Sequence, residues 1–449
     1  MTAPRSIRRF GKRRRAILAL CLAASLTGAC GGQKQRSTVL TVATVNNHDM
    51  LTLKAMSPSF EAAHPDIKLR WVVLEENILR QRQTIDVATR SGIFDVITTG
   101  SYEIPIWSER GMLRPFRPTS SYEVDDLLPP IRSALSRDGK LYAGPFYGES
   151  SMTYYRKDLF AKAGLTMPEA PTWQFIYNAA HRLNDPAHGV YGLCLRGKAG
   201  WGENMGVLTA MSNAYGARLF DMAWRPQFAS APWVRTVTDY VAALRRDGPP
   251  GGSSNGYNEM LTMFAGGKCA IWFDATVSAA SLLDPKSSQV ADKTGFAFAP
   301  GTGLSKRSNW LYIWSMAIPA ASRNAEAAGT FIEWATGPVY QRLLAGKRGW
   351  QNVPPGTRLS FYANPTVAAQ PYSAIVRRSI LTADAMRPSV LPVPYRGVQY
   401  ASIPEYQAIG TETGQAFSAA LNGATTPARA ATIAQDAAVR IMADRRGAR

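Results

Sequence analysis

Residues 38–45 read TVLTVATV, and this run of mostly β-branched residues decides the fold class. Such a run predicts a strand that is buried on both faces, as in a parallel sheet covered by helices. A helix is expected over Met50–Ala63, a strand over Ile67–Leu74, a helix over Asn77–Arg90 and a short buried strand over Phe94–Thr98. The apolar positions of the helix expected over Asn77–Arg90 are Ile78, Leu79, Ile85 and Val87. The alternation predicts an α/β fold built on a parallel sheet.

A second series of elements begins after Tyr147-Gly148-Glu149-Ser150, which interrupts the first. The expected elements of this series are a strand over Met152–Arg156, a helix over Lys157–Ala163, a helix capped by Thr172 and ending at Leu183, a helix over Val234–Arg246 and a strand over Ala270–Phe273. Strand Leu311–Pro319 and helix Asn324–Thr336 return to the style of the first series, before a mostly helical end. A chain that leaves one α/β unit, builds a second and comes back predicts two lobes joined by several crossings, a hinge suited to closing.

The N-terminal end predicts an export signal that finishes at a lipid-modified cysteine. A basic start with no acidic residue precedes an apolar run, 16–26, that is too short to cross a bilayer as a permanent helix. Gly28 and Ala29 precede Cys30 as in a bacterial lipoprotein box. We expect a lipoprotein signal peptide over 1–29, lipidation of Cys30, and a tether over 30–38 that holds the protein to the outer face of the cytoplasmic membrane. The alternative is cleavage by the ordinary signal peptidase without a lipid.

Composition favours a globular protein that does not bind nucleic acid. Of its residues, 46% are hydrophobic and 18% charged, as in globular proteins. The length of 449 residues is more than one hydrophobic core normally serves. The formal net charge is +19, and seven of these charges belong to the leader. The other basic residues, such as Arg378 and Arg387, do not form the dense clusters that nucleic-acid binding needs.

Two cysteines remain beyond the leader and the lipid site, Cys194 and Cys269. Both stand in apolar, strand-like runs, Tyr191–Leu195 and Lys268–Phe273. An exported compartment permits disulfides. The sequence leaves two alternatives, a disulfide between them or two buried free thiols on neighbouring strands.

Enzyme and metal motifs are missing from the sequence. It contains no HExxH, no Walker loop and no GxGxxG that opens a helix after a strand, and no GxSxG stands on an elbow between an expected strand and helix. Its histidines, His48, His64, His181 and His188, are isolated and lack metal-ligand spacing. We therefore expect no metal, no cofactor and no catalytic residue. The enzyme alternative is a glycosidase-like pair of carboxylates chosen from Glu103, Glu149, Glu203 and Asp274.

The loops that follow the expected strands combine carboxylates, amides and aromatic rings. A polyhydroxylated ligand needs this mixture, because each hydroxyl both donates and accepts a hydrogen bond while aromatic faces cover its C–H surface. In α/β sheets the ligand lies beyond the carboxyl ends of the strands. The candidate ligand-binding residues are Asn46, Asn47, Asp49, Glu75, Tyr102, Glu103, Glu149, Arg196, Trp201, Glu203, Asp274, Asn309, Trp310, Arg396 and Tyr400. For any one of them the alternative is a loop cap or a solvated polar group.

Several segments resemble the family 1 extracellular solute-binding proteins of ABC importers. The general marks are Tyr155–Leu165, Pro171-Thr172-Trp173 and Phe264–Ala270. A closer resemblance, to the sorbitol- and mannitol-binding branch of that family, is carried by the segments 43–47, 74–77, 145–152, 195–205, 272–276 and 353–357. Together these segments span most of the chain after the leader.

The resemblance implies an α/β, two-lobe periplasmic-binding-protein-like (Venus flytrap) fold with hinge crossings and a ligand cleft between the lobes. Crossings are expected near Tyr147–Ser150, Asn309–Leu311 and Pro388–Pro394. The predicted division is 39–148 with 311–388 for the first lobe, 149–310 with 389–440 for the second, and 441–449 for a basic tail.

The function implied by the resemblance is capture of a sugar alcohol of the sorbitol or mannitol kind and its delivery to the permease subunits of an ABC importer by a monomeric binding protein. Glu149 and Arg196 are the contacts expected to drive closure, with Tyr102 and Trp201 as aromatic walls. The alternatives are a binding protein for a mono- or oligosaccharide, a surface glycosidase or lyase, and an envelope adhesin.

Overall fold

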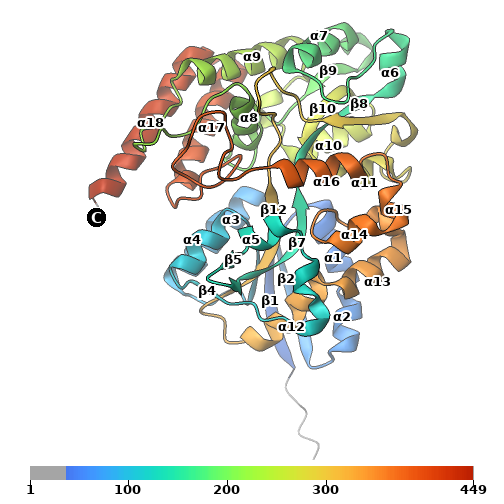
Figure 1. Ribbon diagram of the computed structural model, residues 1–449, viewed down its shortest axis with the longest axis vertical. Helices are drawn as coiled ribbons and strands as arrows, with labels where there is room; N and C mark the ends of the chain where they lie inside the picture. Colours follow the sequence, from blue (N-terminus) through green and yellow to red (C-terminus); the bar gives the residue numbers. More distant parts are fainter. Residues whose placement is uncertain (1–36, 448–449) are drawn as a thin grey trace, which may run out of the picture. The chain divides into compact units, whose positions relative to one another are not determined.

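The computed structural model describes residues 37–447, and Figure 1 shows two groups of strands and helices within this part of the chain. The predicted signal peptide and Cys30 lie outside the described residues. Among residues 37–447, no helix combines the length and the apolar character that crossing a membrane requires.

The first sheet lies in the lower part of Figure 1 and contains the strand with which the sequence pattern begins. Its order is β2 (Ile67–Leu74), β1 (Thr38–Val45), β3 (Val96–Gly100), β12 (Tyr312–Pro319) and β4 (Leu113–Arg114), and β7 (Ala143–Glu149) also pairs with β12. β1 runs parallel to β2 along its whole length and parallel to β3. The parallel arrangement predicted from the first strands is therefore confirmed for β1, β2 and β3, whereas β12 runs antiparallel to β3 and to β7 and makes the sheet as a whole mixed.

Helices cover this sheet at the places where its buried residues need cover. α3 (Glu76–Thr89) packs against β1 and β2, α2 (Pro58–Ala63) packs against β2, and α12 (Ala325–Thr336) packs against β12, β7 and β1. α1 (His48–Met56) starts at Asn47, whose side-chain oxygen caps it by accepting from the amide N–H of Met50.

The face of α3 that packs on the sheet is partly polar. Of its four apolar positions, Leu79 and Val87 are buried while Ile78 and Ile85 are exposed. The remaining buried positions of this helix are polar, namely Arg80, Gln83 and Asp86. A helix that buries a guanidinium needs partners for it, and these are found at the functional site described below.

The second sheet has the order β11 (Thr294–Phe298), β8 (Ser151–Arg156), β10 (Cys269–Ala275) and β9 (Tyr191–Cys194). β8 is antiparallel to both of its neighbours, and β9 is parallel to β10. α7 (Trp173–Leu183) packs against β9 and β10 and begins where the sequence predicts, because the Thr172 hydroxyl accepts from the Phe175 amide.

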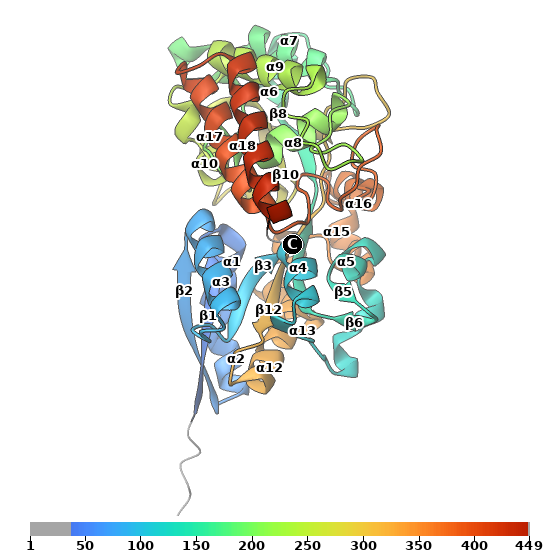
Figure 2. The same cartoon turned by 90° about the vertical axis from the view of Figure 1, so that its left-hand side faces the viewer.

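The C-terminal helices pack on the second sheet's helices. α17 (Tyr406–Asn422) and α18 (Pro427–Gly447) contact each other, and both contact α9 (Ala231–Asp247). α17 also packs against α8 (Asn204–Ala214), the helix that follows the loop after β9. Figure 2 shows α17 and α18 beside these helices in the upper half of the view.

Two chain crossings join the sheets directly. Ser150 alone separates β7, in the first sheet, from β8, in the second. Residues 299–311 lead from β11 in the second sheet back to β12 in the first. α16 (Ser373–Thr382) packs against β8 and β11 of the second sheet and against β7 of the first. The predicted limits of the two lobes stay a prediction.

Cys194 of β9 and Cys269 of β10 form a disulfide, with Cα atoms 6.0 Å apart. Both residues are fully buried. The structure thus selects the first of the two alternatives that the sequence leaves open. The bond joins neighbouring parallel strands just before the loop that carries Arg196.

Removing this disulfide is expected to lower the free energy of unfolding by about 2 to 5 kcal/mol, because the loop that it closes in the unfolded chain spans 75 residues. Cys194→Ala, Cys269→Ala and the double variant should lose the same amount, since either substitution breaks the one bond. Denaturant unfolding of the three variants under non-reducing conditions measures this. A double variant that loses the sum of the two single losses would contradict it.

Candidate functional site

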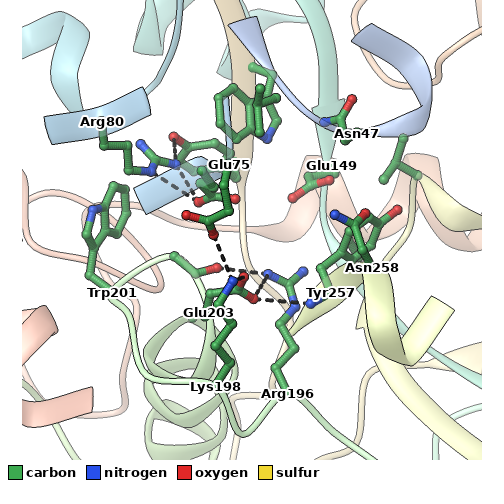
Figure 3. Close-up of a pocket in the computed structure, with 18 of the residues that line it drawn as sticks. Asn47, Glu75, Arg80, Glu149, Arg196, Lys198, Trp201, Glu203, Tyr257 and Asn258 are labelled. Atoms are coloured by element: carbon green, nitrogen blue, oxygen red, sulfur yellow. Dashed lines mark hydrogen bonds and ion pairs between the residues drawn. The ribbon is translucent and has the colours of Figure 1, made fainter. Parts of the chain in front are cut away.

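A cavity of about 210 Å³ lies between residues carried by the two sheets, and Figure 3 shows side chains from both groups facing it. Its first-sheet side is formed by Val45, Asn46, Asn47, Glu75, Glu76, Arg80, Tyr147, Glu149, Tyr312 and Trp314. Its second-sheet side is formed by Arg196, Lys198, Trp201, Gly202, Glu203, Gly206, Tyr257, Asn258, Glu259, Ala275 and Val277. Trp310, which precedes β12, and Gln399, which precedes α17, complete the lining.

More than half of the predicted ligand-binding residues line this one cavity. They are Asn46, Asn47, Glu75, Glu149, Arg196, Trp201, Glu203 and Trp310. They reach it because β1, β2, β7 and β9 all end at its edge, which places the residues after each strand side by side.

The other predicted residues do not line this cavity, so the expectation that they contact a ligand stays a prediction. Asp274 and Glu103 each hold an arginine of the lining by an ion pair. Tyr102 and Tyr400 pack their rings around Trp201, at centroid distances of 4.8 and 6.3 Å.

The remaining three predicted residues are engaged or placed elsewhere. The Asn309 amide donates to the carbonyl oxygen of Ser379 at 3.3 Å. Arg396 is exposed, and Asp49 lies in the first turn of α1, where burial raises the pKa of its carboxyl to about 6 against the opposing effect of His48.

Several lining residues escaped prediction. They are Glu76, Arg80, Tyr147, Lys198, Tyr257, Asn258, Glu259, Tyr312, Trp314 and Gln399. Glu76 directly follows the chosen Glu75, and Tyr147 stands two residues before the chosen Glu149. Arg80 stands one helical turn after Glu76, a spacing at which their side chains meet. Tyr312 and Trp314 alternate along β12 and so share one face of it, which the strand pattern alone indicates. Tyr257 and Asn258 begin α10 (Tyr257–Ala265), and no local signal connects them with the cavity.

Arg196 is held in place by Asp274. Its Nε lies 2.9 Å from Oδ2 and 3.1 Å from Oδ1 of that carboxylate, and its Nη1 donates to the carbonyl oxygen of Gly202 at 2.8 Å. Both side chains are buried. Burial lowers the pKa of Arg196, but the Asp274 carboxylate outweighs it and the net direction is upward. Arg196 therefore stays charged and is already neutralised before any ligand arrives.

Arg80 connects the two sides of the cavity. Its guanidinium bonds the carboxylates of Glu103 at 2.5 Å and Glu76 at 2.9 Å and donates to the Tyr312 hydroxyl at 2.8 Å. All these partners belong to the first-sheet side. Its carbon Cζ also lies 4.0 Å from the ring centroid of Trp201, on the second-sheet side. A cation over an indole face in a desolvated place is attractive, so this contact draws the two sides together.

Other contacts also span the two sides. The Lys198 ammonium lies 2.8 Å from Glu75 and 3.7 Å from Glu203. The Asn258 amide donates to the carbonyl oxygen of Asn46 at 3.3 Å. Gly202 approaches α3 so closely that a Cβ atom there would lie 2.1 Å from a carboxylate oxygen of Glu76 and would force that side chain to move. The cavity is closed at these places.

Glu149 ends β7 and presents a carboxyl group to the cavity that is only 7% exposed. Burial raises the pKa of Glu149 to about 8; Arg196 opposes this, while Asp274, Glu76 and Asp49 add to it. Burial also raises the pKa of Glu203 to about 7, again against Arg196. Near neutral pH, Glu149 therefore carries a proton and offers both a donor and an acceptor.

Unpaired polar atoms complete the lining. The indole N–H groups of Trp201 and Trp310 and the amide oxygen of Gln399 are buried and have no hydrogen-bond partner among the described residues. Buried polar groups without partners are uncommon, and at a cavity they are the groups that a ligand satisfies. Rings of tyrosine and tryptophan supply the apolar part of the wall.

A second cavity, of about 1150 Å³, lies on the first-sheet side between α2, α12 and α13 (Pro338–Arg348). None of the predicted ligand-binding residues lines it. Its carboxylate Glu333 already accepts from Thr119 and Ser121. Among residues 37–447, no group of three His, Cys, Asp or Glu side chains is placed to hold a metal ion.

Comparison with known proteins identifies the class. Residues 45–342 match the family of bacterial extracellular solute-binding proteins, and the chain belongs to this family. The match confirms the resemblance expected from the sequence and the two-lobe periplasmic-binding-protein fold. Since the family is one of extracellular proteins, membership indicates an exported location.

Individual relatives are more specific. The chain is 50% identical to the mannitol-binding protein of Pseudomonas aeruginosa, over 95% of this chain and 97% of that protein. A crystal structure of an ABC transporter solute-binding protein from Agrobacterium vitis with bound D-mannitol is 54% identical, has a TM-score of 0.90, and is matched over 91% of this chain and 99% of that one. A ribitol complex from Agrobacterium radiobacter is 25% identical, with a TM-score of 0.80 over 90% of this chain and 98% of that one.

The buried carboxyl of Glu149 predicts that stability falls as pH rises. An unfolded glutamate ionises near pH 4.5, whereas the folded Glu149 keeps its proton up to about pH 8, so between these values the folded state binds more protons than the unfolded state. Glu149→Gln lacks this penalty. Its free energy of unfolding should equal that of the natural chain near pH 4.5 and exceed it by up to about 4 kcal/mol above pH 8.

Urea denaturation at the two pH values measures this difference. Glu412→Gln, at a residue of α17 whose side chain is 41% exposed, is the matched control for the substitution itself. An equal difference for Glu149→Gln at both pH values would show that the ionisation of Glu149 is not its cause.

Proposed function

We propose that this protein is the substrate-binding component of an ABC importer and that it binds a neutral, linear sugar alcohol of the mannitol type in the cavity between its two sheets. The observation that carries the proposal is the state of the polar groups around the cavity. Every cation of the lining already has a carboxylate partner, while the groups left unpaired are neutral donors and acceptors. A neutral hydroxyl-rich molecule satisfies such groups without adding a charge.

The relatives support the same ligand class. The relative with 50% identity is a mannitol-binding protein, and the crystal structure with 54% identity holds D-mannitol. A more distant structure holds ribitol. All of these ligands are open-chain polyols. An acyclic polyol loses several torsional freedoms on binding, so its hydroxyls need nearly complete pairing, and the mixed lining of this cavity supplies both donors and acceptors for it.

The wider role follows from the class. We propose that lipidated Cys30 anchors the mature chain to the outer face of the cytoplasmic membrane, that the chain works as a monomer, and that its ligand-closed form is what the permease subunits recognise. In this mechanism the protein breaks no bond. Closure is driven by contacts that exist only when both sides meet over the ligand, and the Arg80–Trp201 and Lys198–Glu75 contacts stabilise that form.

Calorimetric titration of the full-length protein should show one site for D-mannitol, with weaker binding of D-sorbitol or ribitol and no comparable binding of D-glucose. A pyranose leaves part of the lining unpaired, and each unpaired buried group costs about 1 to 3 kcal/mol. D-mannitol at a thousandfold excess over its dissociation constant should stabilise the fold by about 4.1 kcal/mol. The absence of heat and of any stabilisation with the whole alditol panel would refute the proposal.

Trp310→Phe should weaken D-mannitol binding by about 1 kcal/mol, roughly fivefold, because it removes the unpaired indole N–H while keeping an aromatic ring in the wall. Trp71→Phe is the matched control. Trp71 also has an unpaired indole N–H but does not line the cavity, so its substitution should leave the affinity unchanged. Equal effects of the two substitutions would mean that Trp310 acts through the fold and not through the ligand.

A further inference from the structure

Glu149 differs from every other carboxylate that lines the cavity. Glu75 and Glu203 bond Lys198, Glu76 bonds Arg80, and Glu259 accepts from the Gly256 amide at 2.9 Å. The Glu149 carboxyl has no hydrogen-bond or ion-pair partner among the described residues, although 93% of this residue is buried. No interaction line reaches Glu149 in Figure 3, whereas several reach Arg196, Lys198 and Glu203.

The positive charges of the cavity are not free to serve Glu149. Arg80 is shared by two carboxylates and a tyrosine hydroxyl, and Arg196 is bound through both carboxylate oxygens of Asp274. Lys198 lies between two glutamates. A neutral ligand therefore meets no unpaired cation, and a positively charged one meets no uncompensated repulsion.

The surroundings of Glu149 favour a positive charge at that point. The charged and titratable groups that act on it are Arg196, Asp274, Glu76, Asp49, Tyr147, Tyr257 and Tyr154. Three of these are carboxylates from three different elements, and the single guanidinium among them is the one that Asp274 already holds. A buried carboxyl with an excess of acidic neighbours binds a cation more readily than it bears its own charge.

We propose that the cavity also accepts alditols in which one hydroxyl is replaced by an amino group, and that the carboxylate of Glu149 binds the ammonium. This inference rests on the proposed function, because the rest of the ligand is the same polyol chain. An ammonium and a hydroxyl each add one heavy atom, so such a ligand fits wherever the parent alditol fits. The ammonium brings three donors, and among the described residues Glu149 is the carboxylate in the lining that no side chain occupies.

The two ligand types differ in what happens to the proton of Glu149. A neutral alditol leaves the carboxyl protonated, and the group then both donates and accepts. An ammonium is bound by the ionised carboxyl, so Glu149 gives up its proton to the solvent. Because burial holds the pKa of Glu149 near 8, binding of the ammonium form below that pH releases about one proton. Its affinity then rises about tenfold for each pH unit up to that value, whereas the affinity for the neutral alditol stays constant.

The test is calorimetric titration of the full-length protein with 1-amino-1-deoxy-D-mannitol, with its N-acetyl derivative, which is neutral, and with D-mannitol. Each titration is made in two buffers of different ionisation enthalpy at two pH values about one unit apart, both below the pKa of Glu149. We expect release of about one proton and a tenfold rise in affinity for the amine alone. The proton count on the unaltered chain answers the question without any substitution.

Glu149→Gln separates the two ligands. The amide keeps the shape, the donor and the acceptor of the protonated acid but cannot ionise, so the D-mannitol affinity of this variant serves as the reference for the amine. The ratio of the amine affinity to the D-mannitol affinity should fall about 10- to 150-fold relative to the natural chain. Glu412→Gln makes the same change on an exposed residue outside the cavity and should alter neither affinity.

Opposite results would overturn the inference in a recognisable way. If D-mannitol binds but the amine releases no proton, or binds no better than its N-acetyl derivative, Glu149 is not an ammonium site and the proposed function stands. If Glu149→Gln weakens both ligands equally, the carboxyl does not discriminate between them. If no alditol binds the natural chain, the proposed function fails and takes this inference with it.

Discussion

The ion pairs that hold Arg196 and Arg80 are the constraint on which the ligand cavity depends. Asp274 and Glu103 do not touch the cavity, yet they neutralise the two guanidinium groups that do. Without them, Arg80 would keep only Glu76, and Arg196 only the more distant Glu203 at 3.8 Å, so more positive charge would face the ligand. With them, the arginines serve as fixed, preorganised groups, and truncation of either carboxylate would leave a buried guanidinium less well compensated. Two carboxylates that do not line the cavity, Asp274 and Glu103, therefore favour a neutral ligand.

The two sides of the cavity meet at a chain crossing and at a few side-chain contacts. β7 passes into β8 through Ser150 alone, so Glu149, the last residue of β7, lies at the junction of the two sheets. Away from this junction, the sides touch where Arg80 and Tyr102 pack on Trp201 and where Lys198 meets Glu75. The Lys198–Glu75 pair is partly exposed to water and therefore weak, which suits the opening and closing that we propose.

Sequence reasoning reached the fold because its elements follow local rules. β2 was placed over Ile67–Leu74 as observed, and Thr172 caps α7. Reasoning about the site succeeded where a polar residue directly follows a strand. The same reasoning missed Arg80, which lies on the buried face of α3. Its partner Glu103 comes from another element, and apolar periodicity cannot indicate such a pair. The exposed position of Arg396 could not be foreseen either, since no local pattern fixes how a long irregular segment turns.

Glu149 shows why a residue that weakens the fold is kept at the centre of a site. Its burial raises the free energy of the ionised form, which destabilises the protein at neutral and alkaline pH. The same exclusion of water strengthens any hydrogen bond that the group makes to a ligand, because little solvent competes for it. A surface carboxylate would avoid the penalty but would bind a hydroxyl no better than water does. Stability given up in the empty cavity is thus recovered when a polyol or an ammonium pairs the carboxyl, and this difference between the empty and the occupied site favours the closed form with ligand inside.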